Sequence, residues 1–297
     1  MARVQGLVMI EPIGFRFNAE TATTNSFQHK NITDAQAAAL QEWLNVVDAL
    51  KQHHFEVITY RPSNDSTPDA VFPNNWFSTH DSGKLLLYPM MADNRRAERN
   101  NAIVQQLQEK YNYHSVINLS RYETQHAFLE GTGSIVFDHD YKLAYAAISP
   151  RTHLDPLLEV CEHLGCLPVV FETTSSDGNP IYHTNVVMSI GPSIAIVAED
   201  CIVDERNQLS VRKLLQFSNK TILSITNQQM QSFCGNVLFA TNSLDNEFAI
   251  LSDTAWNAFT REQQTMLSNH ATPIIVNIPV IERVGGGGVR CMIAELF

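Results

Sequence analysis

The chain has 297 residues, and its 31 Asp and Glu outnumber its 20 Lys and Arg, so the formal net charge is -11. This acidic balance argues against nucleic acid as a partner, because phosphate binding needs a basic face. No stretch approaches the ~18 uninterrupted apolar residues of a membrane span, and the N-terminus lacks the basic-then-apolar order of a signal peptide, so we expect a cytoplasmic protein. Small polar molecules remain as expected partners, and the sequence is compatible with a homo-oligomer.

Five segments show the periodicity of amphipathic helices. Apolar residues recur at helical spacing from Thr33 to His54, and Thr33 with Gln36 forms a capping box that predicts where this helix begins. Shorter patterns predict helices at residues 95–111, 154–164, 211–217 and 261–269. A second capping box, Thr260 with Gln263, precedes the last of these.

Apolar runs of strand length lie between the predicted helices and outnumber them about two to one. They cover residues 7–10, 55–60, 84–88, 134–137, 143–148, 167–171, 186–190, 194–198, 221–225, 237–240, 248–251 and 274–278. Pairs of strands between helices indicate repeated ββαβ units, whereas simple alternation would give a doubly wound sheet. No linker rich in Pro, Gly or Ser divides the chain, so we expect residues 1–297 to form a single domain.

The chain has five cysteines, an odd number with irregular spacing that is typical of a reducing compartment. Cys161 and Cys166 bracket His163, which could suggest a metal site. Five residues along a helix turn about 140° away, so the two thiols face different sides and we expect no metal there.

The C-terminus combines a run of four glycines, Gly285–Gly288, with Cys291. Glycine lets backbone approach a ligand closely, and a thiolate is a good nucleophile. Upstream, Glu130 stands in Leu-Glu-Gly-Thr-Gly and His183 in Tyr-His-Thr-Asn. Glutamate, histidine and cysteine are the parts of a thiol-based acyl or amidino transfer site, although a glycine run alone could equally be a flexible turn.

Further polar residues stand at the ends of predicted elements. Asp69 begins an expected strand that Asn74 and Asn75 end, Arg95 opens an expected helix, and Arg151 follows an expected strand. Taken alone, paired Asn are turn residues, and an Arg at an element end can be a surface residue or a bidentate ligand for a carboxylate. Each motif by itself is therefore ambiguous.

Together these motifs resemble the guanidine-modifying, or pentein, superfamily of arginine deiminases, dimethylarginine dimethylaminohydrolases and amidinotransferases. Pro-Asp-x-Val-Phe, the Arg pair, Glu-Gly-x-Gly, Arg-Thr, the His motif and the late Cys occur in the family's order across the whole chain. The resemblance implies an α/β pentein fold, a five-bladed propeller of ββαβ units with pseudo-fivefold symmetry and a site on its axis. It implies no cofactor and no metal.

By position, the resemblance assigns roles to the polar residues. Cys291 is expected to be the nucleophile, His183 the general acid and base, and Glu130 the carboxylate that orients His183 or binds the reacting nitrogen. The residues expected to bind the amino-acid end of the substrate are Asp69, Arg95 and Arg151. The Gly285–Gly288 amides and Arg290 are expected to stabilise negative charge.

Three departures from the family pattern point to the substrate. Asn74 and Asn75 replace the Glu-Asp of the dimethylarginine enzymes, and Asn185 replaces the Asp of the His-x-Asp in arginine deiminases. A buried guanidinium without paired carboxylates is costly, whereas Asn offers a neutral group both a donor and an acceptor. These residues therefore favour a neutral ureido group. The segment of residues 17–28 also resembles the citrulline-utilisation hydrolase branch of the family, in which such a loop can cap the site.

We accordingly expect hydrolysis of L-citrulline to ornithine, ammonia and carbon dioxide through a covalent intermediate on Cys291. An arginine deiminase or a dimethylarginine dimethylaminohydrolase is the first alternative, because Asp69 and Glu130 could neutralise a guanidinium. An amidinotransferase is a weaker alternative. The same fold serves as a non-catalytic ribosome-binding factor, but such a factor has no reason to keep the glutamate, histidine and cysteine together.

Overall fold

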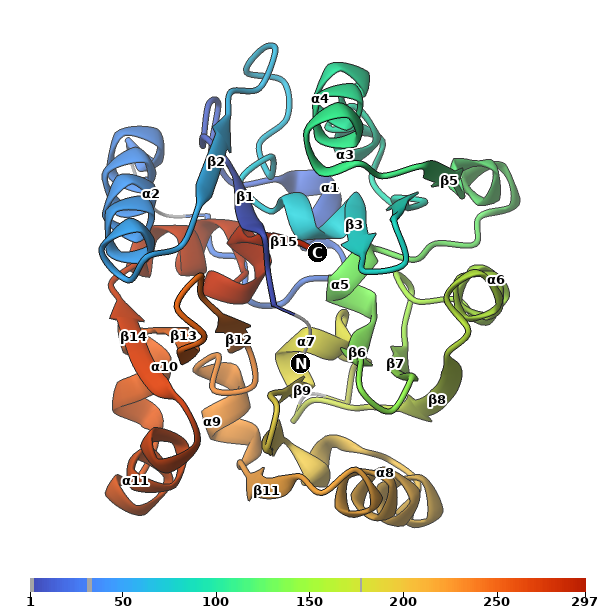
Figure 1. Cartoon of the computed structure of the whole chain (residues 1–297), viewed down its shortest axis with the longest axis vertical. Coiled ribbons are helices and arrows are strands. Elements are labelled where there is room, and N and C mark those ends of the chain that lie inside the picture. Colours follow the sequence, from blue (N-terminus) through green and yellow to red (C-terminus); the bar gives the residue numbers. More distant parts are fainter. Residues whose placement is uncertain (1–2, 31–33, 177) are drawn as a thin grey trace.

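The computed structural model describes residues 3–30, 34–176 and 178–297, and it contains five three-stranded sheets set around a central axis (Figure 1). In every sheet the middle strand pairs antiparallel with the innermost strand and parallel with the outermost one. A helix connects the middle strand to the outermost strand and lies on the periphery of the molecule. The predicted ββαβ unit and the five-bladed pentein architecture are confirmed.

The blades are built from the following elements. In the order innermost strand, middle strand, helix and outermost strand, they are β15 (Ala294–Leu296), β1 (Gly6–Ile10), α2 (Ala35–Gln52) and β2 (Val57–Tyr60); β3 (Phe77–His80), β4 (Lys84–Leu87), α4 (Asn101–Tyr111) and β5 (Ser115–Asn118); β6 (Val136–Asp138), β7 (Leu143–Ile148), α6 (Leu154–Leu164) and β8 (Leu167–Glu172); β9 (Met188–Ile190), β10 (Ile194–Val197), α8 (Glu205–Phe217) and β11 (Thr221–Ser224); and β12 (Leu238–Thr241), β13 (Glu247–Ser252), α11 (Arg261–His270) and β14 (Thr272–Val276).

Shorter elements join and cap these blades. They are the α-helices α1 (Ala19–Ala22), α3 (Asp93–Arg96), α5 (Gly131–Ser134), α7 (Thr184–Val187), α9 (Asn227–Gln231) and α10 (Asp253–Ala258), the 3₁₀ helices η1 (Pro73–Asn75), η2 (Ser120–Gln125), η3 (Glu199–Cys201) and η5 (Val289–Met292), and the π-helix η4 (Ile281–Gly285).

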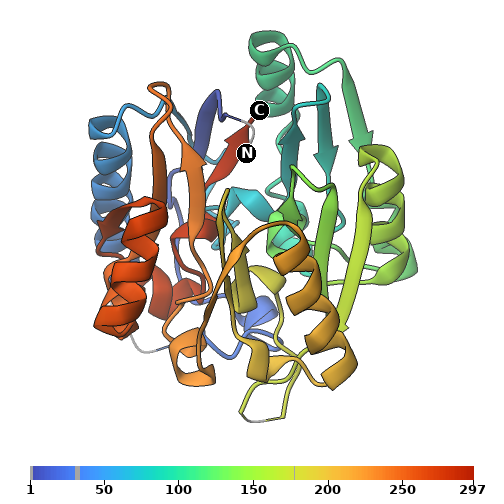
Figure 2. The same ribbon diagram turned by 60° about the horizontal axis from the view of Figure 1, so that its bottom comes forward.

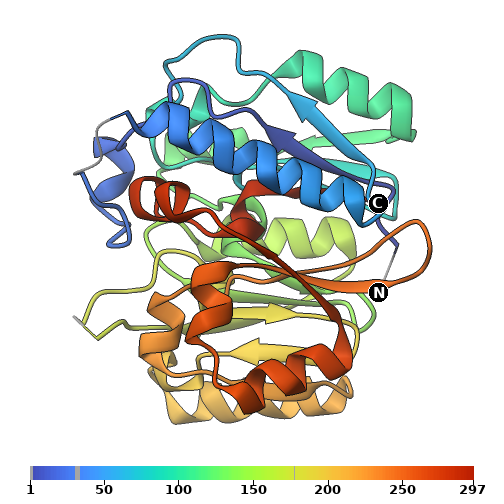
Figure 3. The same ribbon diagram turned by 90° about the vertical axis from the view of Figure 1, so that its left-hand side faces the viewer.

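The two ends of the chain close the ring of blades. β15 pairs antiparallel with β1, with Gly6 opposite Leu296, and β1 pairs parallel with β2. The first blade is therefore completed by the last strand of the chain. The start of β1 and the C-terminus lie at one end of the axis, whereas α1 lies at the opposite end (Figure 3).

The middle strands are apolar except at the ends of β4 and β13, where Lys84, Glu247 and Ser252 stand, because both of their faces are buried between blades. In β7, Tyr145 and Ala147 pack into the core shared with the blade of β10, whereas Ala144 and Ala146 pack into the core shared with the blade of β4. Such a strand reads as a continuous apolar run rather than an alternating one. The turned view shows the strands lining the centre and the helices outside them (Figure 2).

Several expected elements differ in the structure. The Thr260–Gln263 capping box is present at α11, but Thr33 lies outside the described residues, and the N-cap of α2 is Asp34, which makes no side-chain capping bond. Gln36 instead accepts a hydrogen bond from the Gly14 amide at 3.1 Å. The predicted helix over 95–111 is two helices, because the chain leaves α3 after Arg96 and α4 has its own cap at Asn100.

The strand expected between Asp69 and Asn74–Asn75 was wrong. Residues 69–72 form turns that lead into η1, where Pro73 occupies the first helical position. The runs beginning at Ser134 and Val186 likewise start in the short helices α5 and α7 and become strands only afterwards. Strands β3, β5 and β15 and helices α1, α9 and α10 were missed, because these short segments contain too many polar residues to read as apolar runs or amphipathic helices.

The described residues contain no helix long and apolar enough to cross a membrane.

Candidate active site

The polar residues converge because each innermost strand is preceded by a turn or a short helix that ends on the axis. Glu130 is the N-cap of α5, His183 is the N-cap of α7, and Cys291 lies in η5. Asn75 lies in η1, and in the remaining blade Asn236 stands two residues before β12 begins. The fold therefore brings one polar side chain from each blade to the same place.

Glu130 and His183 form a buried hydrogen-bonded pair. His183 Nε2 lies 2.9 Å from Glu130 Oε2. Burial lowers the pKa of His183 to about 4, although the hydrogen bond and charge of Glu130 oppose this shift. At neutral pH the imidazole is therefore uncharged; with its Nε2 proton donated to Glu130, its Nδ1 is free to accept a proton.

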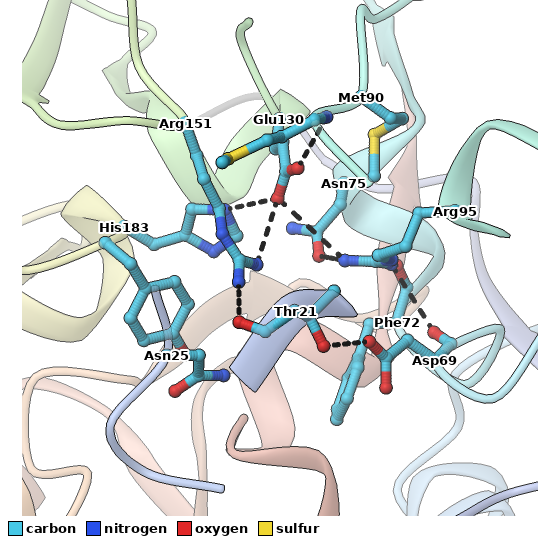
Figure 4. A network of polar contacts seen from close by, with 12 residues as sticks. Thr21, Asn25, Asp69, Phe72, Asn75, Met90, Arg95, Glu130, Arg151 and His183 are labelled. Carbon is cyan, nitrogen blue, oxygen red and sulfur yellow. Dashed lines mark hydrogen bonds and ion pairs between the residues drawn. The ribbon is translucent and has the colours of Figure 1, made fainter. Parts of the chain in front are cut away.

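Glu130 stays ionised although it is completely buried. Burial alone would raise the pKa of this carboxyl, but the charge of Arg151 and the hydrogen bond from His183 hold the pKa well below its usual range. Arg151 Nη1 lies 3.4 Å from Glu130 Oε2, and Arg95 Nη1 lies 4.0 Å from the same oxygen. Figure 4 shows the two guanidinium groups on opposite sides of this carboxylate. The expected role of Glu130 in orienting His183 fits this geometry.

The Cys291 thiol is contacted by two amide groups. Asn185 Nδ2 and Asn236 Nδ2 each lie 3.4 Å from Cys291 Sγ. Burial raises the pKa of Cys291, while these two amides oppose the shift. The free protein therefore holds a protonated thiol whose thiolate the amides can stabilise once the proton is transferred.

Sequence reasoning missed Asn236. Its side chain also donates to the Asn185 carbonyl at 3.0 Å, so it fixes both the thiol and its neighbouring amide. The available signal was positional: Gly235-Asn236 precedes a predicted strand in the same way that the other site residues precede theirs.

Arg95 is held by groups of the protein. Its Nε and Nη2 donate to the two oxygens of Glu98, each at 2.9 Å, and its Nη1 donates to Asn75 Oδ1 at 2.6 Å. Glu98, a second residue that sequence reasoning missed, is buried, and burial raises its pKa to about 7 although the Arg95 charge opposes this. Arg95 thus positions Asn75 as well as lying at the cavity wall.

The two neighbouring asparagines differ in placement. Asn75 lines the cavity next to Cys291, and its Nδ2 is buried without a hydrogen-bond partner among the described residues. Asn74 donates through Nδ2 to Thr132 Oγ1 at 3.2 Å and does not line the cavity. The structure therefore brings Asn75, but not Asn74, to the expected substrate position.

Residues 17–28, called here the N-terminal cover, lie across the site. Arg151 Nη2 donates to the Thr21 carbonyl at 2.6 Å, and Arg151 Nε donates to Thr24 Oγ1 at 2.9 Å. Asp69 Oδ2 accepts from Thr21 Oγ1 at 2.9 Å and from Asn18 Nδ2 at 2.8 Å. Two of the three residues expected to bind the amino-acid end of a substrate, Asp69 and Arg151, are thus occupied by the cover (Figure 4).

The glycine run contacts the N-terminal cover through its carbonyl groups. Gln28 Nε2 donates to the Gly285 carbonyl at 3.0 Å, and Asn25 Nδ2 donates to the Gly286 carbonyl at 3.1 Å. Arg290 pairs with Glu295 at 2.9 Å and lines a separate narrow cavity between the innermost strands. Arg290 does not line the cavity at Cys291, but its positive charge opposes the rise that burial causes in the pKa of Cys291, in the direction expected of a residue that stabilises negative charge.

The enclosed space beside Cys291 measures only about 10 Å³, which is room for about one water molecule. An amino acid can enter only after the N-terminal cover moves. Among the residues that the structure describes, no group of three or more His, Cys, Asp and Glu is placed to hold a metal ion.

Fold and site together define a pentein with a buried cysteine, histidine and glutamate on its axis. Residues 11–297 match the model of the family described as eukaryotic N,N dimethylarginine dimethylhydrolase. The chain therefore belongs to this family of hydrolases. A comparison with curated protein sequences finds no match.

Three solved structures illustrate the similarity. ArgZ, an arginine dihydrolase from the ornithine-ammonia cycle in cyanobacteria, is 15% identical with a TM-score of 0.77, over 98% of this chain and 40% of that chain. The N-terminal domain of ArgZ bound to substrate is 16% identical with a TM-score of 0.76, over 98% of this chain and 97% of that domain. DDAH from Pseudomonas aeruginosa in complex with citrulline is 15% identical with a TM-score of 0.70, over 99% and 100% of the two chains. This chain thus spans about two fifths of full-length ArgZ.

Proposed function

We propose that the protein hydrolyses the ureido group of L-citrulline, with Cys291 as the nucleophile. The observation that carries this proposal is the orientation of the Asn75 amide. Its Oδ1 accepts from Arg95 Nη1, so the amide cannot be flipped without placing two donors against each other. Its unpartnered Nδ2 therefore offers a hydrogen-bond donor to the cavity.

A donor at this position favours a ureido oxygen over a guanidinium. A guanidinium carries only donors and would leave Asn75 Nδ2 unsatisfied, whereas the ureido carbonyl accepts. The Glu130 carboxylate is already paired with His183 and Arg151 and accepts the Met91 amide at 3.1 Å. No free carboxylate pair is thus left among the described residues of the cavity for a guanidinium.

Asp69 supports a role at the amino-acid end of the substrate. Its Oδ1 is buried without a partner among the described residues, while its Oδ2 binds the N-terminal cover. The α-ammonium of an amino acid would satisfy Oδ1, and its α-carboxylate would replace the Thr21 carbonyl at Arg151. We infer that Asp69 and Arg151 bind the substrate when the cover opens.

The proposed reaction has two steps. The Cys291 proton passes to His183, the sulfur attacks the ureido carbon, and His183 returns the proton to the departing ammonia, leaving a thiocarbamoyl enzyme. A water activated by His183 then attacks the same carbon, and the thiol is released with its proton. The carbamate produced loses carbon dioxide and gives ornithine.

Arginine dihydrolysis is the second candidate, because the similar structure ArgZ is an arginine dihydrolase. The deciding experiment incubates the protein separately with citrulline, arginine and dimethylarginine and separates the amino-acid products. We expect ornithine from citrulline and no turnover with the Cys291→Ser variant, while Cys166→Ser, which changes a partly buried thiol between α6 and β8 that does not line the cavity, keeps the activity. Ornithine or citrulline formed from arginine, or citrulline that is not consumed, would refute the proposal.

A further inference from the structure

Two arginines, Arg95 and Arg151, line the cavity at Cys291, and the protein holds them in different ways. Arg151 Nη2 and Nε donate to Thr21 and Thr24, which belong to the N-terminal cover (Figure 4). Both contacts are lost when the cover moves away to admit a substrate. The guanidinium of Arg151 then has free N–H groups at the cavity wall, as a ligand for a carboxylate requires.

The contacts of Arg95 do not involve the cover among the residues that the structure describes. Four of its five N–H groups are taken by other segments. Its Nε and one N–H of Nη2 bind Glu98, the second N–H of Nη2 donates to the Phe72 carbonyl at 3.1 Å, and Nη1 donates to Asn75 Oδ1. The fifth is on Nη1, which lies 4.0 Å from Glu130 Oε2. Opening of the cover therefore leaves the partners of Arg95 in place.

Glu98 is the residue that fixes Arg95. Both side chains are buried, and their two parallel hydrogen bonds form the bidentate arrangement that is the strongest between a guanidinium and a carboxylate. A substrate carboxylate could take two N–H groups of Arg95 only by displacing one of its partners. Displacing Glu98 would leave a buried charge unpaired, which is costly.

Arg95 in turn determines which end of the Asn75 amide faces the substrate. The contact between Nη1 and Oδ1 is 2.6 Å long, and it leaves Asn75 Nδ2 directed to the cavity without a partner among the described residues. Without Arg95 the amide is free to turn over and present Oδ1 instead. An oxygen there would repel the ureido oxygen and accept from a guanidinium.

We propose that Glu98 and Arg95 are positioning residues for the reacting end of the substrate, whereas Arg151 takes the α-carboxylate. Glu98 holds Arg95, Arg95 holds the Asn75 amide, and the amide distinguishes a ureido from a guanidino group. Arg95, which the sequence placed at the amino-acid end, thus serves the opposite end. The role of the amide rests on the proposed hydrolysis of citrulline; the division of roles between the two arginines does not.

The first test compares ligands that differ only in the α-carboxylate, citrulline and N-carbamoylputrescine. Their dissociation constants are measured by calorimetry in the Cys291→Ser background at pH 8, where Glu98 is ionised because burial raises its pKa only to about 7. Arg151→Ala should weaken citrulline at least about tenfold more than N-carbamoylputrescine, since a charge-assisted contact is lost. Glu98→Gln should weaken both by the same factor. A loss confined to citrulline in Glu98→Gln would make Arg95 a carboxylate ligand and overturn the proposal.

The second test measures the coupling between Glu98 and Asn75. In the same background, Glu98→Gln should lower the preference for citrulline over arginine at least about fivefold, the value of one hydrogen bond. In the additional presence of Asn75→Asp, Glu98→Gln should leave the preference unchanged, because a carboxylate presents an oxygen whichever way it turns. A role of Glu98 in stability alone would give equal shifts with and without Asn75→Asp, and that result would overturn the proposal.

Glu199→Gln is the matched control. Glu199 accepts from Nε and Nη2 of Arg212, at 2.8 and 2.5 Å, in the same arrangement as the pair of Glu98 and Arg95, but neither of these residues lines the cavity. This variant should leave both comparisons unchanged. Shifts as large as those of Glu98→Gln would show that loss of any buried ion pair has this effect, and would overturn the proposal.

Arg95→Lys keeps the test valid if Glu98→Gln does not fold. Lysine retains the positive charge beside Glu98 but lacks the planar group that reaches Glu98 and Asn75 together. It should weaken citrulline and N-carbamoylputrescine equally and lower the preference for citrulline over arginine; a loss confined to citrulline would overturn the proposal. A protein that binds arginine but not citrulline would contradict the proposed function alone, and arginine with agmatine then gives the same comparison of the two arginine side chains.

Discussion

At the scale of single residues, the site is governed by which donors and acceptors remain free after the protein has satisfied the others. Glu130 is saturated by His183, Arg151 and a backbone amide, whereas Asp69 Oδ1 and Asn75 Nδ2 are left without partners among the described residues. Buried polar groups without partners are rare and call for an explanation. A bound substrate with an ammonium at one end and a carbonyl at the other would supply it.

Replacing Asn75 with Asp should shift the preference from citrulline toward arginine. The substitution exchanges the free donor for a carboxylate oxygen, which attracts a guanidinium and leaves the ureido oxygen facing a negative charge. We expect a loss of citrulline kcat/KM that corresponds to about 1–3 kcal/mol, together with a gain for arginine. The measurement is kcat/KM for both substrates in the two proteins.

Asn74→Asp is the matched control for this substitution. Asn74 is the same residue type one position earlier, but it binds Thr132 and does not line the cavity. Its effect on the ratio of the two kcat/KM values should therefore be small. An equal shift in both variants, or an unchanged ratio in Asn75→Asp, would contradict the ureido interpretation.

The pH dependence of kcat/KM should follow the shifted pKa values of the catalytic pair. In the proposed mechanism, the reactive state contains one proton shared between Cys291 and His183, so it exists above the pKa of His183 and below that of Cys291. Burial lowers the pKa of His183 to about 4 and raises that of Cys291. Activity should therefore form a broad plateau across neutral pH, fall on the acid side near pH 4 and fall on the basic side only above the ordinary thiol range. A decline centred near pH 6.5 in a protein that circular dichroism shows to be folded would contradict this assignment.

At the scale of elements, the N-terminal cover is the part that must move. Its contacts with the site are mostly single hydrogen bonds from short polar side chains, among them Asn25 to the Gly286 carbonyl and Gln28 to the Gly285 carbonyl. Contacts of this kind contribute modestly and can be broken one at a time. The sequence indicated that this segment could cap the site; the contacts that close it come from Asp69, Arg151 and the glycine run, which lie far away in the chain.

Asn25→Ala should loosen the cover. The lost hydrogen bond to the Gly286 carbonyl is worth about 1 kcal/mol, so the open state should become about fivefold more populated. Hydrogen exchange of the amides in residues 18–28 should accelerate by a similar factor. Thr23→Ala is the control, because Thr23 is exposed and bonds only to the Glu20 carbonyl within the cover. Equal acceleration in both variants would show that the Asn25 contact does not close the cover.

At the scale of the whole molecule, closure of the ring makes the first blade depend on the last residues of the chain. Beyond the β1 pairing, the Glu295 carbonyl accepts from Thr79 Oγ1 at 2.9 Å, and the Phe297 carbonyl accepts from the Tyr113 hydroxyl at 3.0 Å. Each blade also shares its core with both neighbours. We therefore propose that residues 1–297 unfold as one domain.

Leu296→Ala tests this cooperativity. Leu296 is fully buried in β15, so the substitution should lower the free energy of unfolding by about 2–5 kcal/mol. Leu167→Ala should cost little, since Leu167 is 67% exposed in β8. Urea unfolding followed by tryptophan fluorescence and by circular dichroism should show one coincident transition; separate transitions for the two probes would refute a single cooperative domain.

The repeated unit and the main chemical groups can be predicted from the sequence alone, whereas the way those groups are used depends on the tertiary structure. Apolar runs paired between helices predict ββαβ units. A middle strand that is buried on both faces is recognisable because its sequence is a continuous apolar run rather than an alternation of apolar and polar residues. Glu130, His183 and Cys291 were identified because their motifs are local. The separate roles of Asn74 and Asn75, and the contacts made by Glu98 and Asn236, depend on side-chain directions and on partners from other blades. A single chain pattern does not contain that information, because ring closure alone brings segments more than 200 residues apart into contact.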